Sequence, residues 1–194
     1  DKMHWTLAPF TIYLGVKGKI ENLEHHNYFL GSNFRGYADM IFTSSISPQK
    51  PYYYVNVSSK SYAECAPEGC ENIFILCPVP DLRFKNNWDD REELAQNIID
   101  DLSARVGYDI SGNIITKKIM DPIDWEKAFN LYKGSGLGLA HDMDQVGGFR
   151  PKNKDEKLGN LYYVGASTTP GTGLPMVVIS SKLVMERLEK DHGI

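Results

Sequence analysis

The sequence has few cysteines, no long apolar run and no excess of basic residues. Its three cysteines, Cys65, Cys70 and Cys77, lack paired C-x-x-C spacing, so they predict neither a disulfide framework nor a zinc site, and we expect reduced thiols. The formal net charge of −4 argues against a nucleic-acid-binding protein, which would usually carry a basic stripe. No stretch approaches the roughly 18 apolar residues that a transmembrane helix requires. Residues 1–4 resemble neither a signal peptide nor a transit peptide.

Signature motifs of hydrolases, metalloenzymes and nucleotide-binding proteins are also missing. The sequence contains no G-x-S-x-G, H-E-x-x-H or Walker motif, so hydrolysis and metal-dependent catalysis are not indicated, and we predict no metal ligands. The glycine-rich run 134–138 follows a helix-like segment, and Asp142 and Asp144 come too soon after it for a dinucleotide-binding loop. If the protein is an enzyme, a bound cofactor would therefore carry its chemistry.

Three of the five histidines stand out, and none is predicted to be catalytic. His25 and His26 are adjacent in a strand-like segment, so their side chains would point to opposite faces, which favours one surface and one core side chain over a shared metal site. His141 lies in a glycine-rich run, where we favour a side chain that satisfies loop backbone over a direct role in a site. The catalytic residues are left unassigned.

The pattern of strands and helices predicts an α/β or mixed α+β fold with a packed core. Hydrophobic residues make up 42% of the sequence and charged residues 24%, as in ordinary globular domains. The expected strands cover 8–16, 26–30, 51–57, 71–80, 113–120 and 161–164. The expected helices cover 33–46, 87–106 with Gly107 as its cap, a segment that begins at Asp121-Pro122, and about 175–190.

The stretch from 160 to 184 has more glycine and proline than a turn between a strand and a helix needs. Pro175 suits the first turn of a helix, because its missing N–H would have no partner there. Gly165, Gly171 and Gly173 would keep Cβ atoms away from whatever lies over the crossing. The small residues Ser180 and Ser181 would allow close approach of backbone. The buried face of this helix is expected to contain Met176, Leu183, Val184 and Leu188.

The amino-terminus of that helix would point unpaired N–H groups and a partial positive charge toward the loop. Such a place suits a phosphate, a carboxylate or a ring that becomes anionic. A flavin fits the last description, because its pyrimidine edge gains negative charge on reduction. A crowded structural turn explains the same pattern equally well, so the residues alone leave both interpretations open.

The stretch NLYYVGASTTPGTGLPMVVISSKL at 160–183 and five further segments point to a known family. The five segments are LEHHNYFL, PYYYVNVSS, APEGCENIFILCPVP, DWEKAFNLYKGSGLGLAHD and GGFRP. Together, and in this order, they resemble the bacterial and fungal type of phytoene desaturase. The stretch at 160–183 is similar to the C-terminal flavin-contacting motif of that family. The similarity extends from about Phe10 to Leu188, and the tyrosine-rich, charged style is closer to the fungal enzymes.

This resemblance implies an FAD-dependent oxidoreductase of the amine-oxidase-like flavoprotein superfamily. Such enzymes desaturate phytoene toward lycopene in carotenoid biosynthesis, so the implied partners are a long polyene hydrocarbon and a membrane surface on the cytoplasmic side, with no nucleic acid. The implied cofactor is FAD, and NAD is one candidate for the oxidant. The implied cofactor contacts are Gly165, Ala166 and Ser167 by the phosphate–sugar arm and Thr172, Gly173, Leu174, Pro175, Met176 and Val177 by the ring.

The resemblance also implies a domain organisation. Residues 1–133 would belong to the substrate-side domain, and residues 134–194 would form a glycine-rich segment and the C-terminal return strand and helix of the FAD domain. The family begins with a glycine-rich ADP-binding fold that these 194 residues lack. We therefore expect the later part of a longer enzyme, inactive and without tightly bound FAD when alone.

Alternative functions remain open at this point. A related carotenoid isomerase or retinoid saturase would share the loop, and a non-catalytic module for an apolar ligand would need no flavin. Five aromatic residues are candidates either for the lining of a long apolar cavity or for ordinary core packing: Phe10, Tyr13, Tyr28, Phe29 and Tyr53. His141 and Arg150 are candidates for the architecture of the site, and neither is assigned as a base. The number of desaturation steps and the oligomeric state are not predicted.

Overall fold

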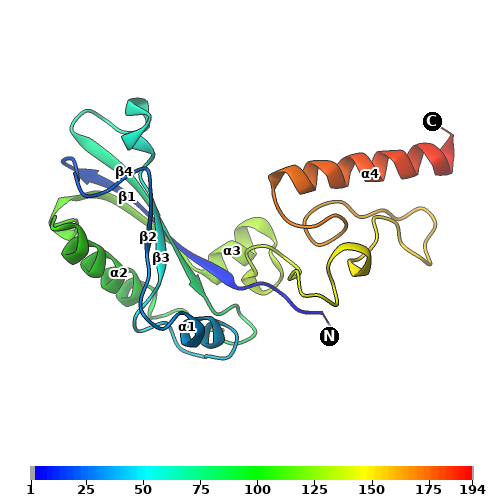
Figure 1. Cartoon of the computed structure of the whole chain (residues 1–194), viewed down its shortest axis with the longest axis horizontal. Helices are drawn as coiled ribbons and strands as arrows, with labels where there is room; N and C mark the ends of the chain where they lie inside the picture. The colour runs from blue at the N-terminus through cyan, green and yellow to red at the C-terminus, as the bar shows by residue number, and fades with distance from the viewer. Residues whose placement is uncertain (1–2, 194) are drawn as a thin grey trace. The chain divides into compact units, whose positions relative to one another are not determined.

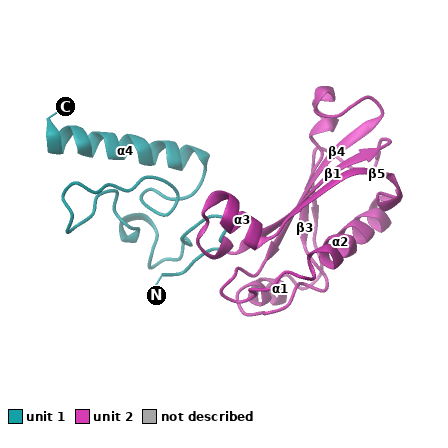
Figure 2. Ribbon diagram, turned by 180° about the vertical axis from the view of Figure 1, so that it is seen from behind, with its two compact units in different colours: residues 1–6, 135–194 teal, residues 7–134 magenta. Residues whose placement is uncertain are grey.

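The computed structural model describes residues 3–193 and divides the chain into two compact units. One is Leu7–Gly134, here called the sheet unit, and the other combines Asp1–Thr6 with Ser135–Ile194, here called the loop unit (Figure 2). Each unit is described by itself. Asp1 and Lys2, which belong to the segment where no signal peptide is expected, lie outside the described residues.

The sheet unit contains five antiparallel strands in the order β2-β3-β4-β1-β5 (Figure 1). The strands are β1 Ala8–Lys17, β2 His26–Phe29, β3 Tyr53–Asn56, β4 Cys70–Val79 and β5 Ile114–Met120. β4 lies in the middle of the order, and every second residue from Glu71 to Val79 is buried, which confirms the prediction of a buried strand there. β5 is an edge strand, and most of its side chains are exposed.

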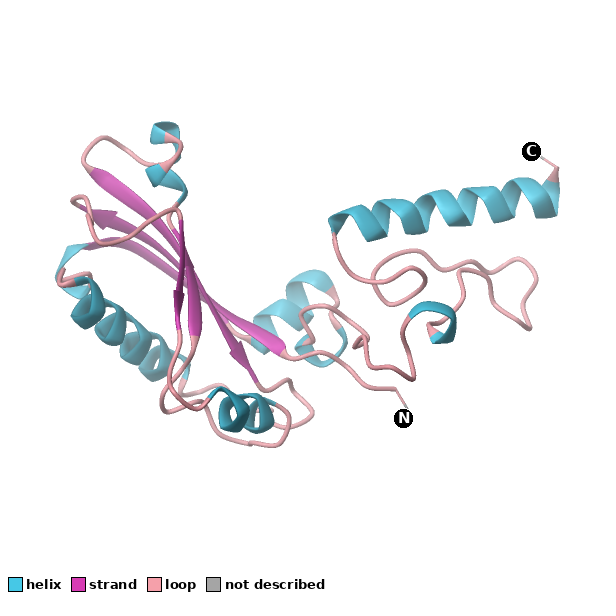
Figure 3. Cartoon of the chain, in the orientation of Figure 1, coloured by secondary structure: helices cyan, strands magenta, loops and turns pink. Residues whose placement is uncertain are grey.

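One long helix, α2 at Arg91–Val106, packs on one face of the sheet (Figure 3). Leu94, Ile98 and Leu102 repeat every four residues, so they share one helix face, and they are buried in one cluster with the inward side chains of β1, β3 and β4. Each such side chain contributes about 1.5–3 kcal/mol through the apolar surface removed from water. Gly107 ends the helix in the left-handed conformation, as predicted.

Two shorter helices complete the sheet unit, α1 at Phe34–Ile41 and α3 at Pro122–Phe129. α3 begins where Asp121-Pro122 predicts. The Asp121 carboxylate accepts hydrogen bonds from the first-turn N–H groups, and the Asp124 side chain completes a capping box. Short 3₁₀ turns lie at Ser58–Lys60, Ala63–Cys65, Ser111–Asn113, Tyr132–Gly134 and, in the loop unit, Gly147–Phe149.

Four predictions in the sheet unit are wrong in detail. The helix predicted over 87–106 begins only at Arg91, after a turn at Asp89 and Asp90. The helix predicted over 33–46 ends at Ile41, because the Thr43 hydroxyl takes the Asp39 carbonyl that a longer helix would use. The strand predicted over 51–57 is limited to β3. His25 and His26 do not point to opposite faces, since their ring centroids lie 4.3 Å apart. His25 precedes β2, so strand alternation does not apply to it.

The loop unit contains one long helix, α4 at Leu174–His192, close to the predicted 175–190. The strand predicted over 161–164 is wrong. Tyr162 forms an isolated bridge with Lys154, and Val164 is 60% exposed, because within residues 3–6 and 135–193 no strand pairs with this apolar run along its length. The face predicted to be buried on α4 is only half-buried, except at Ser180, which is fully buried. Across residues 3–193, no helix combines the length and apolar character needed to cross a bilayer.

Candidate functional site

The loop from Gly165 to Gly173 precedes α4 and is held by a buried arginine. Arg150 is 2% exposed. Its guanidinium donates hydrogen bonds to the carbonyl oxygens of Ala166 at 2.6 Å, Leu139 at 3.0 Å, Ala140 at 3.0 Å and Thr168 at 3.2 Å. Two of these carbonyls belong to the loop and two to the glycine-rich segment before it. Arg150 therefore clamps one segment against the other, which supports its predicted place in the architecture of the site.

The Arg150 side chain is buried, and this affects both its pKa and the strength of its hydrogen bonds. Removal from water lowers the pKa of its guanidinium, although an arginine side chain stays protonated in proteins. The hydrogen-bond partners given above are carbonyl dipoles rather than carboxylates. Hydrogen bonds that involve a charged group contribute about 1.5–3 kcal/mol each. The backbone of the loop is thus fixed by the same bonds that make the buried charge tolerable.

A second buried side chain, Asn153, joins the loop to α4. Its amide nitrogen donates to the Thr169 carbonyl at 2.8 Å and to Ser180 Oγ at 3.2 Å. Ser180 Oγ in turn accepts a hydrogen bond from the backbone nitrogen of Gly165 at 3.1 Å. The close approach predicted at Ser180 is confirmed, whereas Ser181 is exposed and its hydroxyl donates to a carbonyl of its own helix. Sequence reasoning missed Asn153, because no local pattern marks it.

The second half of the loop lies against His141. The Nε2 atom of His141 accepts a hydrogen bond from the backbone nitrogen of Thr172 at 3.2 Å, which confirms the prediction that this side chain satisfies loop backbone. Gly171 lies so close that a Cβ atom there would stand 2.7 Å from the same Nε2. Its φ of 136° also favours glycine. The space predicted to be kept free by glycine is therefore filled, at this position, by His141.

The amino-terminus of α4 has no side-chain cap. Gly173 is its N-cap, and no side chain accepts a hydrogen bond from the first turn there. Pro175 lies in that first turn, as predicted, and Leu174 is 85% exposed. A helix of 19 residues carries a partial positive charge at this end, and its first N–H groups have no partner within the helix. The geometry suits a ligand with an anionic or hydrogen-bond-accepting edge.

The nine predicted cofactor contacts form two groups, and each group makes a hydrogen bond to the glycine-rich segment at 137–139. Ser167 Oγ accepts a hydrogen bond from the Leu139 nitrogen at 3.4 Å, and the Thr172 hydroxyl donates to the Leu137 carbonyl at 2.8 Å. Both groups consist of backbone, small side chains and apolar side chains. These residues fit a flavin, which needs close backbone approach, N–H donors and an apolar wall. Their contact with FAD stays a prediction.

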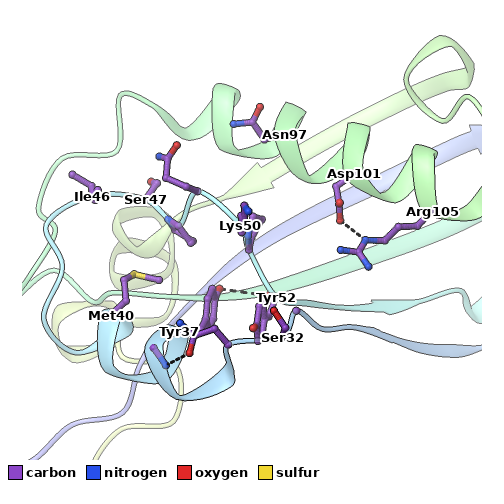
Figure 4. A pocket seen from close by; sticks show the side chains of 16 residues that line it. Ser32, Tyr37, Met40, Ile46, Ser47, Lys50, Tyr52, Asn97, Asp101 and Arg105 are labelled. Atoms are coloured by element: carbon purple, nitrogen blue, oxygen red, sulfur yellow. Dashed lines mark hydrogen bonds and ion pairs between the residues drawn. The ribbon is translucent and has the colours of Figure 1, made fainter.

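The sheet unit has a separate cavity of about 760 Å³ between α1, the loop before β3, and α2 (Figure 4). Tyr37 and Tyr52 stack at its wall with ring centroids 4.4 Å apart, and Arg105 pairs with Asp101 at 2.7 Å. None of the five aromatic candidates for a long apolar cavity lines it. Phe10 and Tyr53 are buried in the core and Phe29 packs against it, while Tyr13 and Tyr28 lie on the opposite face of the sheet.

A small group of polar side chains lies near the amino-terminal end of the loop unit. His4, Asp142 and Asp144 are exposed, and their potential ligand atoms lie within 4.8 Å of one another. His4 Nδ1 stands 2.6 Å from the Asp142 carboxylate. Exposed acidic side chains commonly lie this close without a metal ion, so the group carries no metal assignment.

The chain is similar over almost its whole length to several curated desaturases. It is 38% identical over 190 residues to the zeta-carotene-forming phytoene desaturase of Myxococcus xanthus, a match that covers 97% of the chain and 37% of that protein. It is 34% identical over 214 residues to the phytoene desaturase of Fusarium fujikuroi, covering 100% of the chain and 38% of that protein. It is 35% identical over 197 residues to the carotenoid 3,4-desaturase of Haloarcula japonica, covering 98% of the chain and 39% of that protein.

The matches cover nearly all of this chain but only a part of each relative. The chain spans less than two fifths of the length of the three relatives named above. No protein-family model matches the chain. Identity of 34–38% over at least 97% of the chain nevertheless indicates common ancestry with this part of the relatives.

Proposed function

We propose that this chain, which is homologous to part of the phytoene and carotenoid desaturases, is a segment of an FAD-dependent desaturase that converts phytoene toward lycopene. The observation that carries the cofactor assignment is the uncapped amino-terminus of α4 behind the loop that Arg150 clamps. The fold would be the later part of an amine-oxidase-like flavoprotein. The sheet unit would lie on the substrate side, and the loop unit would contain the return to the FAD domain.

Each group of loop residues has a distinct task in this proposal. When bound, FAD would supply the hydride-accepting chemistry for desaturation at an allylic carbon, a base or water would take the proton, and NAD is one candidate for the final oxidant. Gly173, Leu174 and Met176 would present backbone to the ring, and Ala166 and Ser167 would lie along the phosphate–sugar arm. Arg150 and His141 hold the loop that carries these contacts, so they are positioning residues rather than catalytic ones.

The same proposal places the protein at a membrane surface on the cytoplasmic side. A forty-carbon hydrocarbon is far more soluble in lipid than in water, so an enzyme that acts on it meets its substrate in or on a bilayer. Apolar side chains in the loop, such as the exposed Leu174, agree with a hydrocarbon substrate near the cofactor. The name of the Haloarcula japonica relative shows that a homologue desaturates a different position of a carotenoid.

Analysis of the products distinguishes desaturation from the two alternative kinds of function. A carotenoid isomerase or a retinoid saturase would use the same loop, but it would yield geometric isomers or reduced compounds. A non-catalytic module for an apolar ligand would bind without flavin and without conversion.

The experiment uses the natural protein that contains these 194 residues, called the parent protein below. It is incubated with phytoene in liposomes, with FAD, and with and without NAD, and the products are separated by chromatography. We expect compounds with additional conjugated double bonds, which are recognised by absorption in the visible range. Phytoene that is unchanged, only isomerised or only reduced would contradict the proposed desaturation.

A further inference from the structure

The face of the sheet that α2 does not cover carries a continuous row of uncharged side chains. Residues directly opposite one another in neighbouring strands lie on the same face, and the register aligns one residue from each of the five strands. In strand order the row is Tyr28, Tyr54, Leu76, Thr11 and Met120. Four interstrand spacings of about 4.8 Å make this row roughly 19 Å long. It crosses the whole width of the sheet.

Aromatic rings contact one another along this row and in the next one. The ring centroids of Tyr28 and Tyr54 lie 5.2 Å apart, and Tyr54 meets Phe74 edge-on at 6.4 Å. Phe74 stands directly opposite Tyr13 in the neighbouring row, with their rings 5.2 Å apart. Tyr28, Tyr54, Phe74 and Tyr13 therefore form a connected aromatic track over β2, β3, β4 and β1.

The four rings of the track reach solvent within the sheet unit, whereas Thr11, at the β1 position of the row, is only 1% exposed, so the accessible surface is the track itself. The long helix α2 packs on the opposite face with the core (Figure 3), and α3 contacts the sheet at β1 and β5. At the β2 end of the track, Tyr28 is 73% exposed, and the three other rings are partly buried. Large aromatic side chains gathered on an open face usually mark a binding surface.

We propose that the extended hydrocarbon chain of the substrate lies along this track, across the strands, against the ring faces. The inference rests on the proposed function and adds to it the residues that hold the hydrocarbon. A neutral hydrocarbon matches the uncharged row. A phosphorylated headgroup or an acidic peptide would need cations along the track, and the lysine of the neighbouring row, Lys118, stands at the β5 edge, beyond Tyr13.

The test removes one ring that the fold does not need. Tyr28 is mostly exposed, so Tyr28→Ala leaves no cavity in the core. In the FAD-loaded parent protein we expect this variant to raise the KM for phytoene about 2–12-fold, the range that one aromatic contact of about 0.5–1.5 kcal/mol represents, with kcat changed less than twofold. The matched control is Tyr62→Ala, which removes an exposed tyrosine that lies outside the strands and is expected to leave KM unchanged.

A second variant, Leu76→Gln, changes the middle of the row, and thermal unfolding verifies that it is folded. The inference predicts a raised KM for both row variants. Unchanged KM in both, with FAD bound and phytoene converted, would overturn the track and leave the proposed function intact. Weakened liposome binding with an unchanged KM in detergent would show a membrane contact instead, and would also overturn it. Absence of FAD and of conversion in the unaltered protein would remove the proposed function and this inference together.

Discussion

The Nε2 atom of His141 accepts a hydrogen bond from the backbone nitrogen of Thr172 at 3.2 Å, and these residues are 31 positions apart in the chain. The bond ties the segment before Arg150 to the last residues before α4. The direction of the helix amino-terminus therefore depends on side chains that lie far from it in sequence. Hydrogen bonds from distant side chains hold the loop, with Gly171 at the closest contact, and in the proposed function this loop holds a planar cofactor.

Substitution of Gly171 tests the contact with His141. A Cβ atom at Gly171 would stand 2.7 Å from His141 Nε2, whereas a Cβ atom at Gly165 would meet nothing within 4 Å. Both residues have positive φ, which costs a side chain of the order of 1–3 kcal/mol. We expect Gly171→Ala to lower the unfolding midpoint of the parent protein more than Gly165→Ala does. The additional His141→Ala change should reverse part of the excess, and equal effects of the two alanines would argue against the contact.

Arg150 offers a second test of the scaffold. Arg150→Met removes the guanidinium that donates to four carbonyl groups, and only the Ala140 carbonyl has a further donor among the bonds described, the Gln145 side-chain amide, so we expect a loss of about 3 kcal/mol or more in the free energy of unfolding. Arg150→Lys should recover only part of it, because one ammonium group cannot reach all four carbonyls. Urea unfolding of the parent protein measures both. Full recovery by lysine would show that charge alone, rather than the spread of the guanidinium, holds the loop.

The buried Glu71 predicts how stability depends on pH. Burial opposes ionisation of this carboxyl group, but a hydrogen bond from Ser59 and the charges of Lys60 and Lys19 outweigh it and lower its pKa below the ordinary 4.5. A lowered pKa means that the stabilisation is complete above the unfolded-state value and is lost as the pH falls through the folded-state value. Glu71→Gln should therefore destabilise the protein by about 1–3 kcal/mol at pH 7 and progressively less below pH 4.5.

Urea unfolding at neutral and acidic pH measures this difference. Glu92→Gln serves as the control, because Glu92 pairs with Lys117 on the surface, where its side chain is 66% exposed, and the expected effect is below about 1 kcal/mol. A difference between the Glu71 variant and the unaltered protein that does not change with pH would contradict the assigned network.

The three thiols are expected to react at different rates. Cys65 is exposed, whereas Cys77 is buried and its burial raises the pKa of its thiol to about 12. Alkylation with iodoacetamide at pH 8, followed by peptide mapping, should modify Cys65 rapidly and Cys77 only after unfolding. Rapid modification of Cys77 in the folded protein would mean that β4 is not buried as described.

The sequence predicted α2 and β4 correctly in kind, because the apolar pattern of each matches the face that it buries. α2 has acids in its first turn, a clear apolar repeat and a terminal glycine, and β4 alternates in the middle of the sheet. The strand predicted from the apolar run at 161–164 is wrong, because a strand needs a neighbouring strand. The run itself does not reveal that its pairing is limited to a single bridge. The predicted helix over 33–46 was too long, since the hydroxyl of Thr43 competes for a helix carbonyl.

The candidate site was only partly visible in the sequence. The glycines and Pro175 marked the loop and the start of α4, because their backbone preferences are local. The network of Arg150, Asn153 and Ser180 could not be predicted, since most of its partners are 10 or more residues apart and depend on how the loop closes. The aromatic track also required the strand register, which sets Tyr28 opposite Tyr54 and separates both rings from the core residue Phe10.

The FAD content of the parent protein tests the central claim most directly. Gly173→Val places a branched side chain at the uncapped start of α4, at a φ of 123°, and Gly159→Val places the same side chain where no atom lies within 4 Å of the new Cβ. After gel filtration, the ratio of flavin absorbance to protein should stay near one for the unaltered protein and for Gly159→Val, and should fall at least tenfold for Gly173→Val. Full flavin content in a folded Gly173→Val variant would contradict the assignment of this helix amino-terminus to the cofactor.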